Sequence, residues 1–325
     1  MATRTRYAPD RGLTARMTAT MFLLGLVFVG FVAALIGILA ATKQSAGLII
    51  FVAIVFGGGA AIISLFYSDK VALAAAGAQV VTPQQAPELH GIVDRLCALA
   101  DMDKPRVAIA PTRMANAFAT GRNSKNSVLC VTEGMLRLPG LTKDELEGVL
   151  AHELSHVAHK DVQVMTVAGL LGITAGLLVR FAFYSELFGG RRGGNNGNAA
   201  LLIPLIMLVS IVVYAISFVL IRMLSRYREL AADRSGALLT GQPSALASAL
   251  QKVSGSMSKI PNEDLRKAAP MSAFYFAPAM SLHGGGGDKL ANLFSTHPSL
   301  EKRLDQLAKI QAQLNNTTPG AKGLK

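Results

Sequence analysis

The sequence predicts an α+β membrane protein that is mostly helical, with four transmembrane helices, a small β-sheet and a soluble part divided over two segments. Of the 325 residues, 51% are hydrophobic and only 16% are charged, whereas a typical soluble domain has about 25% charged residues. The low content of charged residues is not uniform along the chain, because several long runs contain no charged residue at all. Between these runs, stretches with helical periodicity alternate with short strand-like stretches. These observations together indicate the fold class.

Four runs are the candidate membrane spans. Residues 17–42 and 44–68 contain no charge, and each exceeds the roughly 20 residues that a spanning helix needs. Residues 162–179 form a shorter run that ends at Arg180, whose long side chain can reach the interface from a helix end. Residues 199–221 form the fourth, with Pro204 near the start, where a helix tolerates proline. We therefore expect two N-terminal spans in residues 1–68 and a transmembrane hairpin in residues 162–221.

The basic residues predict the orientation. Four arginines precede the first run: Arg4, Arg6, Arg11 and Arg16. The loop before the second run contains only Lys43, so the positive-inside rule keeps the N-terminus in the cytoplasm. Four crossings then return the C-terminus to the same side. Arg191 and Arg192, between the third and fourth runs, do not follow this rule.

Other protein classes fit the sequence less well. The net charge is +12, but the basic residues form no stripe interleaved with aromatic residues. We therefore expect a lipid bilayer with anionic headgroups as a partner and no nucleic acid. A transporter would need ionisable residues within the first two runs, which have none. A cleaved signal peptide would be shorter than the first run and would precede a clear cleavage site.

Residues 69–161 form the first soluble segment. Leu89, Ile92, Leu96 and Leu99 recur at helical spacing. The stretches "PRVAIA" and "SVLCV" are typical of short strands, on either side of the turn-rich "ATGRNSKNS". The two cysteines, Cys97 and Cys130, suggest neither a disulfide framework nor a thiolate metal site, and we expect reduced, buried thiols.

A second helix is expected to begin at Thr142, because Glu145 follows three residues later as in a capping box. It should run through "DELEGVLAHELSHVAHKD" straight into the third run. The second soluble segment, residues 222–314, begins as the continuation of the fourth run, "RMLSRYRELAADRSGALL". After a flexible loop, "SLHGGGGDK", an amphipathic helix places five apolar residues on one face: Leu300, Leu304, Leu307, Ile310 and Leu314. Residues 315–325 are expected to be a disordered tail.

The stretch "LAHELSHVAHKD" contains two histidines with a glutamate between them. His152 and His156 are four residues apart, so they project from one helix face and can share an ion. Zinc favours imidazole nitrogens, and catalytic zinc sites use three protein ligands and a water. Glu153 can reach that water and act as the general base. The alternative is a solvated helix face with accidental histidines, which the apolar flanks of the motif disfavour.

A third ligand must come from elsewhere. His159 lies on the same helix, with awkward geometry, and Glu229 in "RELAADR" is the better candidate. Asp233, one turn later, can accept a hydrogen bond from the other nitrogen of a ligand histidine, which fixes the tautomer of that ring. Spacing alone equally allows both acids to pair on a helix surface with neighbouring arginines: Arg226, Arg228 and Arg234.

Residues 14–312 contain, in order, two apolar spans, "APELHGIVDRL", "NAFATGRN", "DELEGVLAHELSHVAHKD", "SRYRELAADR" and "STHPSLEKRLDQL". In this the chain resembles the HtpX family of bacterial membrane-bound zinc metalloproteases, which are relatives of the CAAX-prenyl endoproteases. The resemblance implies a cytoplasmic zincin-like domain of the gluzincin type, with one zinc ion, Glu229 as third ligand and Asp233 behind a ligand histidine. "AHKD" departs from the family's usual asparagine, basic residue and aspartate.

The resemblance also implies roles outside the metal motif. Asn116, Ala117 and Phe118 would lie on an edge strand above the zinc that pairs with an extended substrate. The alternative is that Asn116 only makes a turn and Phe118 only fills the core. His297 would stabilise the developing oxyanion, and Arg303 would steady Glu229 or the other zinc ligands. The alternative for His297 is an incidental place at the start of a helix.

These elements predict a zinc-dependent endopeptidase in the cytoplasmic membrane of a bacterium, with its active site and both termini in the cytoplasm. The resemblance implies polypeptide substrates, mainly damaged or misfolded membrane proteins in stress-related quality control, and a risk of self-cleavage. A prenyl-protein processing enzyme would usually have more spans. A scaffold without activity would be expected to lack Glu153 or a ligand.

Overall fold

The computed structural model describes residues 10–42, 47, 59–188, 201–257 and 296–317. The chain divides into two compact units. One contains residues 15–66 and 163–224, and we call it the membrane unit; the other contains residues 1–14, 67–162 and 225–325, and we call it the catalytic unit. Each unit combines segments that are far apart in the sequence. Residues 67–162 and 225–325, on either side of the third and fourth apolar runs, therefore belong to one unit.

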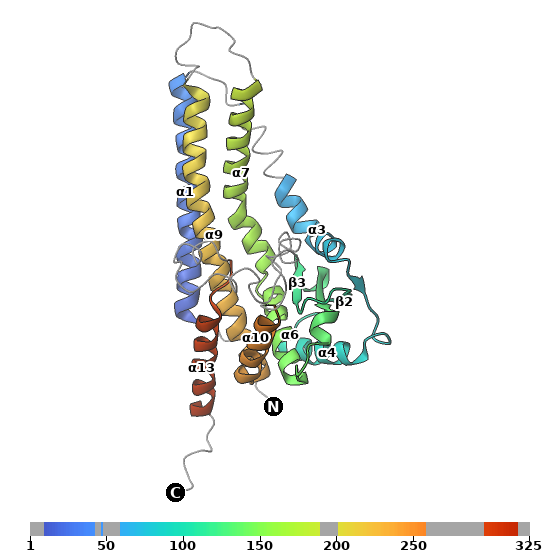
Figure 1. The fold of residues 1–325 in the computed structure, drawn as a ribbon. Coiled ribbons are helices and arrows are strands. Elements are labelled where there is room, and N and C mark those ends of the chain that lie inside the picture. The colour runs from blue at the N-terminus through green and yellow to red at the C-terminus, as the bar shows by residue number, and fades with distance from the viewer. Residues whose placement is uncertain (1–9, 43–46, 48–58, 189–200, 258–295, 318–325) are drawn as a thin grey trace. The chain divides into compact units, whose positions relative to one another are not determined.

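The described part of the membrane unit is built from long apolar helices (Figure 1). They belong to α1 (Arg11–Thr42), α7 (Asp161–Phe188) and α9 (Leu202–Thr240). Leu24 of α1, Leu171 and Leu178 of α7 and Val213 of α9 lie in one buried cluster. Among the described residues, these three helices are long and apolar enough to cross a membrane.

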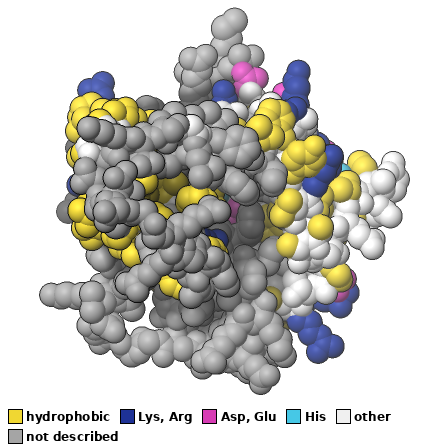
Figure 2. Space-filling view, turned by 90° about the horizontal axis from the view of Figure 1, so that it is seen from above, with side chains coloured by type: hydrophobic (Ala, Val, Ile, Leu, Met, Phe, Trp, Pro, Cys, Tyr) yellow, Lys and Arg dark blue, Asp and Glu magenta, His cyan; other side chains and the backbone are white. Residues whose placement is uncertain are grey.

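Large apolar side chains remain exposed on these helices. Phe22 is 66% exposed, Leu208 59% and Val167 56%. Hydrophobic side chains, yellow in Figure 2, cover a broad part of the visible described surface. Exposed apolar surface of this extent on spanning-length helices is typical of a protein surrounded by lipid.

The second expected span, residues 44–68, lies mostly outside the described residues. Its described end belongs to α3 (Gly59–Ala76), which continues past Ser68, where the charge-free run stops. The loop around Arg191 and Arg192 and the glycine-rich stretch "SLHGGGGDK" also lie outside the described residues.

A small mixed sheet belongs to the catalytic unit. Its strands are β1 (Gln79–Val80), β2 (Arg106–Ala110), β3 (Ala117–Gly121) and β4 (Ser127–Thr132), in the spatial order β1-β2-β4-β3. β2 and β4 are parallel, and the two outer pairs are antiparallel. A short 3₁₀ turn, Ser124–Asn126, precedes β4. The strands expected in "PRVAIA" and "SVLCV" are confirmed, but part of the expected turn "ATGRNSKNS" belongs to β3.

Helices complete the catalytic unit. They are α4 (Pro87–Ala100), α5 (Glu133–Leu136), α6 (Lys143–Ala158), α10 (Pro243–Met257), α13 (Leu300–Thr317) and the last part of α9. Leu96, Leu150, Leu250 and Leu307, from four of these helices, lie in one core cluster. Because this core encloses α6 between other elements, the histidine motif lies on a fixed helix. α13 continues three residues into the expected tail, to Thr317.

The apolar face expected on α4 is partly right. Leu89, Ile92 and Leu96 are buried, but Leu99 is 43% exposed, and Val93 completes the buried face instead. Both cysteines are free and buried, as expected. Burial raises the pKa of the Cys97 thiol to about 11 and that of Cys130 to about 12.

The expected continuous helix from Thr142 into the third span is wrong. The capping box of Thr142 and Glu145 is confirmed, but α6 ends at Ala158 and α7 begins at Asp161. Between them, Lys160 has a left-handed φ of 57°, a conformation that costs a non-glycine residue about 1 kcal/mol. The break turns the carboxylate of Asp161 toward Arg228 and His156. These contacts offset the strain of the left-handed residue, and they bring a carboxylate to the second histidine of the motif.

Candidate metal centre and active site

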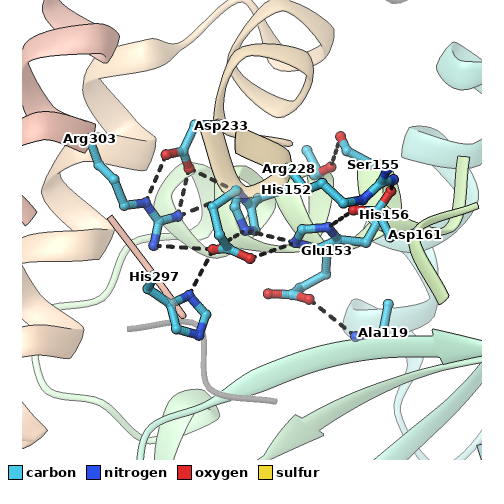
Figure 3. Close-up of polar contacts among 12 residues, drawn as sticks. Ala119, His152, Glu153, Ser155, His156, Asp161, Arg228, Asp233, His297 and Arg303 are labelled. Atoms are coloured by element: carbon cyan, nitrogen blue, oxygen red, sulfur yellow. Dashed lines mark hydrogen bonds and ion pairs between the residues drawn. The ribbon is translucent and has the colours of Figure 1, made fainter. Parts of the chain in front are cut away.

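Two histidines of α6 point into one site (Figure 3). His152 exposes 1% of its side chain and His156 16%. Their Nε2 atoms lie 3.3 Å apart. Because four residues make slightly more than one helical turn, both rings lie on the face of α6 that is turned toward α9.

Glu229 of α9 completes a group of three potential metal ligands. Its Oε2 lies 3.7 Å from His152 Nε2, and its Oε1 lies 3.4 Å from His156 Nε2. One ligand atom from each of the three residues lies within 4.8 Å of the others. Two imidazole nitrogens and a carboxylate oxygen at this spacing fit one zinc ion with a coordination position left for water.

The alternative third ligand, His159, points elsewhere. It caps the C-terminal end of α6, and its Nε2 lies 3.2 Å from Ser235 Oγ. Burial, together with the charges of Arg228 and the neighbouring histidines, lowers its pKa to about 4. His159 therefore lies outside the group of potential ligands.

An aspartate carboxylate contacts the Nδ1 atom of each histidine of the group. Asp233 Oδ1 lies 2.9 Å from His152 Nδ1, and Asp161 Oδ2 lies 2.6 Å from His156 Nδ1. An ionised carboxylate only accepts hydrogen bonds, so each Nδ1 carries the proton and each Nε2 keeps its lone pair for a metal. Sequence reasoning identified Asp233 but missed Asp161. The signal was an aspartate five residues after the second histidine, at the start of the next helix.

Arg303 of α13 holds Asp233 from the other side. Its Nε lies 2.7 Å from Oδ2 and its Nη2 2.6 Å from Oδ1, and the arginine is only 1% exposed. Burial alone would raise the pKa of Asp233, but the charge of Arg303 and the hydrogen bond with His152 lower it. Glu229, which the sequence analysis placed beside Arg303, is more distant, at 3.8 Å.

His297 contacts Glu229. Its Nδ1 lies 3.0 Å from Glu229 Oε2, and the residue is 7% exposed. Burial alone would raise the pKa of Glu229, but His297, together with the two ligand histidines, holds it well below its usual value. His297 is therefore a neighbour of the ligand group, rather than an incidental helix-start residue. Glu229 is ionised, as a metal ligand must be.

Glu153 points away from the three ligands, toward the sheet. The Ala119 amide of β3 donates to its Oε2 at 3.1 Å. The side chain is buried, and burial raises its pKa to about 8, with a smaller opposite effect from His156. A carboxyl group that titrates near neutral pH is suited to accept and return a proton.

β3 is the outer strand of the described sheet, and on the side turned away from β4 its Ala119 amide is bound by Glu153. Asn116 O accepts a hydrogen bond from Thr132 N, so alternate residues from Asn116 onward are bonded to β4. The backbone groups of Ala117 and Ala119 consequently point away from β4. Phe118 packs in a core cluster, as its alternative interpretation held. Asn116 is buried, at 4% exposure.

Two of the three arginines near Glu229 and Asp233 have other partners. Arg228 pairs with Asp161, and Arg234 Nη1 lies 3.4 Å from Gln313 Oε1. In the described structure both acids are instead turned toward the histidines. The helix-surface pairing that spacing alone allowed is therefore not the arrangement found.

Known proteins are similar to the chain in sequence and fold. A family model described as Peptidase family M48 matches residues 83–311. Protease HtpX homolog 1 of Streptomyces coelicolor is 56% identical over 98% of this chain and 99% of its own length. The protease HtpX homolog of Moorella thermoacetica is 47% identical over 96% and 98%. The crystal structure of S. mikatae Ste24p has a similar fold, with a TM-score of 0.55 at 15% identity, over 90% of this chain and 67% of that one.

Proposed function

We propose that this chain, which belongs to peptidase family M48 among the HtpX proteases and is a membrane-bound metalloprotease, is a zinc-dependent endopeptidase that cleaves damaged membrane proteins at the cytoplasmic face. The observation that carries the proposal is the convergence of His152, His156 and Glu229. Two neutral imidazoles and one carboxylate form a donor set that zinc prefers. When bound, zinc would polarise the scissile carbonyl and lower the pKa of the attacking water.

Glu153 moves the proton in this proposal. It follows the first ligand in the chain, and its carboxylate lies between the ligand group and β3. The carboxylate accepts a proton from the attacking water and then donates it to the leaving amine. The Ala119 amide keeps Oε2 in place during both steps. Between the two proton transfers, burial of Glu153 favours its protonated form.

The substrate would extend along the side of β3 that is turned away from β4. The backbone groups of Ala117 and the carbonyl of Ala119 would pair with it there, since the Ala119 amide is bound to Glu153, and pairing through backbone groups accepts many sequences. Asn116 begins this edge, and Phe118 holds the strand on its core. His297, beside Glu229, would stabilise the oxyanion that develops on the scissile carbonyl. Arg303 would act through Asp233, by fixing the carboxylate that orients His152.

The continuity of the helices supports membrane-protein substrates. Glu229 belongs to the same helix as the apolar run of α9, and α7 begins five residues after His156. The ligands therefore lie at the membrane-proximal ends of two spans in the chain. We propose four spans in all, with both termini in the cytoplasm of a bacterial cell. We also propose that the protease can cleave its own chain.

Cleavage of an unfolded test protein by the purified protease in detergent tests this function. Wild type should cleave the substrate, a chelator should stop cleavage, and added zinc should restore it. Glu153→Gln should retain zinc but lose cleavage, because an amide cannot accept the proton. Asp144→Asn, an exposed acid on the same helix, is the matched control and should cleave normally. Near-normal cleavage by Glu153→Gln would remove this residue from the mechanism.

A further inference from the structure

The two ligand histidines are held by two chains of the same composition. His152 Nδ1 contacts Asp233, which is bound by Arg303. His156 Nδ1 contacts Asp161 Oδ2 at 2.6 Å, and Asp161 Oδ1 pairs with Arg228. The first chain joins α6 to α9 and α13, whereas the second joins α6 to the first residue of α7 and to α9 (Figure 3). Only the first was expected from the sequence.

We propose that Asp161 and Arg228 are positioning residues that fix the tautomer and the direction of the second histidine ligand. This inference rests on the proposed function, because the role is defined toward a metal at His156. Asp161 accepts a hydrogen bond from Nδ1 of His156. The lone pair of Nε2 is then directed into the ligand group, on the side where Glu229 lies. Arg228 pairs with the other carboxylate oxygen of Asp161 and so keeps this carboxylate turned toward His156.

The surroundings of His156 explain why it needs this support. Its side chain is 16% exposed, whereas that of His152 is 1% exposed and enclosed by the core. Packing therefore restricts the His156 ring less, and a hydrogen bond from Nδ1 must supply the orientation. Asp161 is in reach only because the chain turns at Lys160, in the left-handed conformation.

Arg228 spans this turn. Its Nη2 donates to the His159 carbonyl at 3.3 Å, before Lys160, and pairs with the Asp161 carboxylate after it. The arginine is 4% exposed and directly precedes the ligand Glu229. One turn of α9 therefore supplies a metal ligand and the cation that orients the carboxylate behind another ligand. Both contacts come from Nη2, whose direction the planar guanidinium fixes, whereas the ammonium of a lysine rotates on a flexible stem.

A purely structural role predicts a different outcome. In that case the pair only joins α9 to the turn between α6 and α7, and its loss lowers stability without changing the affinity for metal. Glu147 provides the matched control. It is a buried carboxylate on α6 that pairs with Arg95, and it lies outside the ligand group. Glu147→Gln breaks an arginine–carboxylate ion pair on α6, the helix that carries both ligand histidines.

The test measures zinc affinity by competition with a chromophoric chelator, on full-length apoprotein in detergent, with the thermal stability of each apoprotein alongside. Asp161→Asn and Arg228→Gln should weaken zinc binding by about 10 to 100-fold. The double variant should be no weaker than Asp161→Asn alone, since the two residues act in series. Glu147→Gln should lower apoprotein stability and keep wild-type zinc affinity.

Two further measurements keep the test decisive. Arg228→Lys, which keeps the charge, should bind zinc more tightly than Arg228→Gln. With cobalt in place of zinc, Asp161→Asn should shift the visible absorption spectrum relative to wild type and to Glu147→Gln. Wild-type zinc affinity in Asp161→Asn and both Arg228 variants would overturn this inference and leave the proposed function standing. Absence of zinc binding by the wild type would overturn both.

Discussion

Asp233 and His152 form a buried pair in which Oδ1 lies 2.9 Å from Nδ1, and neither side chain is more than 1% exposed. Arg303 closes the other side of the carboxylate with two hydrogen bonds. A charged aspartate is stable in such a place only when it is fully paired. The pair therefore links the stability of the core to the orientation of a metal ligand.

Asp233→Asn should weaken zinc affinity by about 10 to 100-fold, because the amide is a weaker acceptor and can present its NH₂ group to His152. It also breaks the buried ion pair of Arg303, which keeps only the more distant Glu229 at 3.8 Å, a loss of about 3–5 kcal/mol in stability. Chelator competition and thermal unfolding measure the two effects. Asp305→Asn, exposed on α13, is the control. Unchanged zinc affinity in Asp233→Asn would show that the pair does not serve the metal.

Gly236 permits the close approach of α9 to α6. A Cβ at this position would lie 2.8 Å from His152 N and 3.0 Å from its Cα. Gly236→Ala should therefore displace α6 at the first ligand and lower both stability and zinc content. At Gly255, in α10, an added Cβ meets nothing within 4 Å, so Gly255→Ala should be neutral or stabilising, by up to about 1 kcal/mol. Equal zinc content and melting temperature in the two variants would contradict this account.

The lowered pKa of Glu145 predicts that the stability of the fold depends on pH. Burial alone would raise its pKa, but hydrogen bonds from Lys252, Ser248 and the Thr142 backbone lower it to about 2. The unfolded value is about 4.3. The ionised group therefore stabilises the fold above that value, and this contribution is lost as pH falls toward 2. Melting temperatures of wild type and Glu145→Gln should differ most at pH 6 and converge as pH is lowered. A constant difference from pH 6 to 3 would refute this.

The proposed topology can be tested with single cysteines. Leu201, before α9, is 58% exposed, and Lys309 is exposed on α13. An impermeant thiol reagent should label Leu201→Cys on intact cells, and Lys309→Cys only after permeabilisation. The native thiols are buried with raised pKa values, so they should react slowly. Labelling of Leu201→Cys only after permeabilisation would indicate a hairpin that re-enters the membrane without crossing it.

Local spacing predicted those features that one helix or one run determines. The charge-free runs indicated α1, α7 and α9, and the four-residue spacing of His152 and His156 gave a shared helix face. The capping box located the start of α6 because its hydrogen bonds lie within three residues. Glu229 and Asp233 needed the family resemblance, since their spacing fitted a surface pair equally well.

Features that depend on distant contacts were missed. The break at Lys160 is stabilised by Arg228, 68 positions later in the chain, so local periodicity favoured a continuous helix. Asp161 was missed for the same reason, because only the break turns it toward His156. The "ATG" of β3 was assigned to a turn, and it is a strand because it pairs with β4. Burial of Arg303 likewise depends on Asp233 of another helix.

The central claim is that His152, His156 and Glu229 together hold one zinc ion, and the zinc content of purified Glu229→Ala tests it most directly. Elemental analysis should find about one zinc per chain in wild type. Glu301→Ala, an exposed acid of α13, should match it as the control. Glu229→Ala should contain far less zinc, because two histidines alone hold the ion weakly. Equal zinc occupancy in wild type and Glu229→Ala would contradict the three-ligand site.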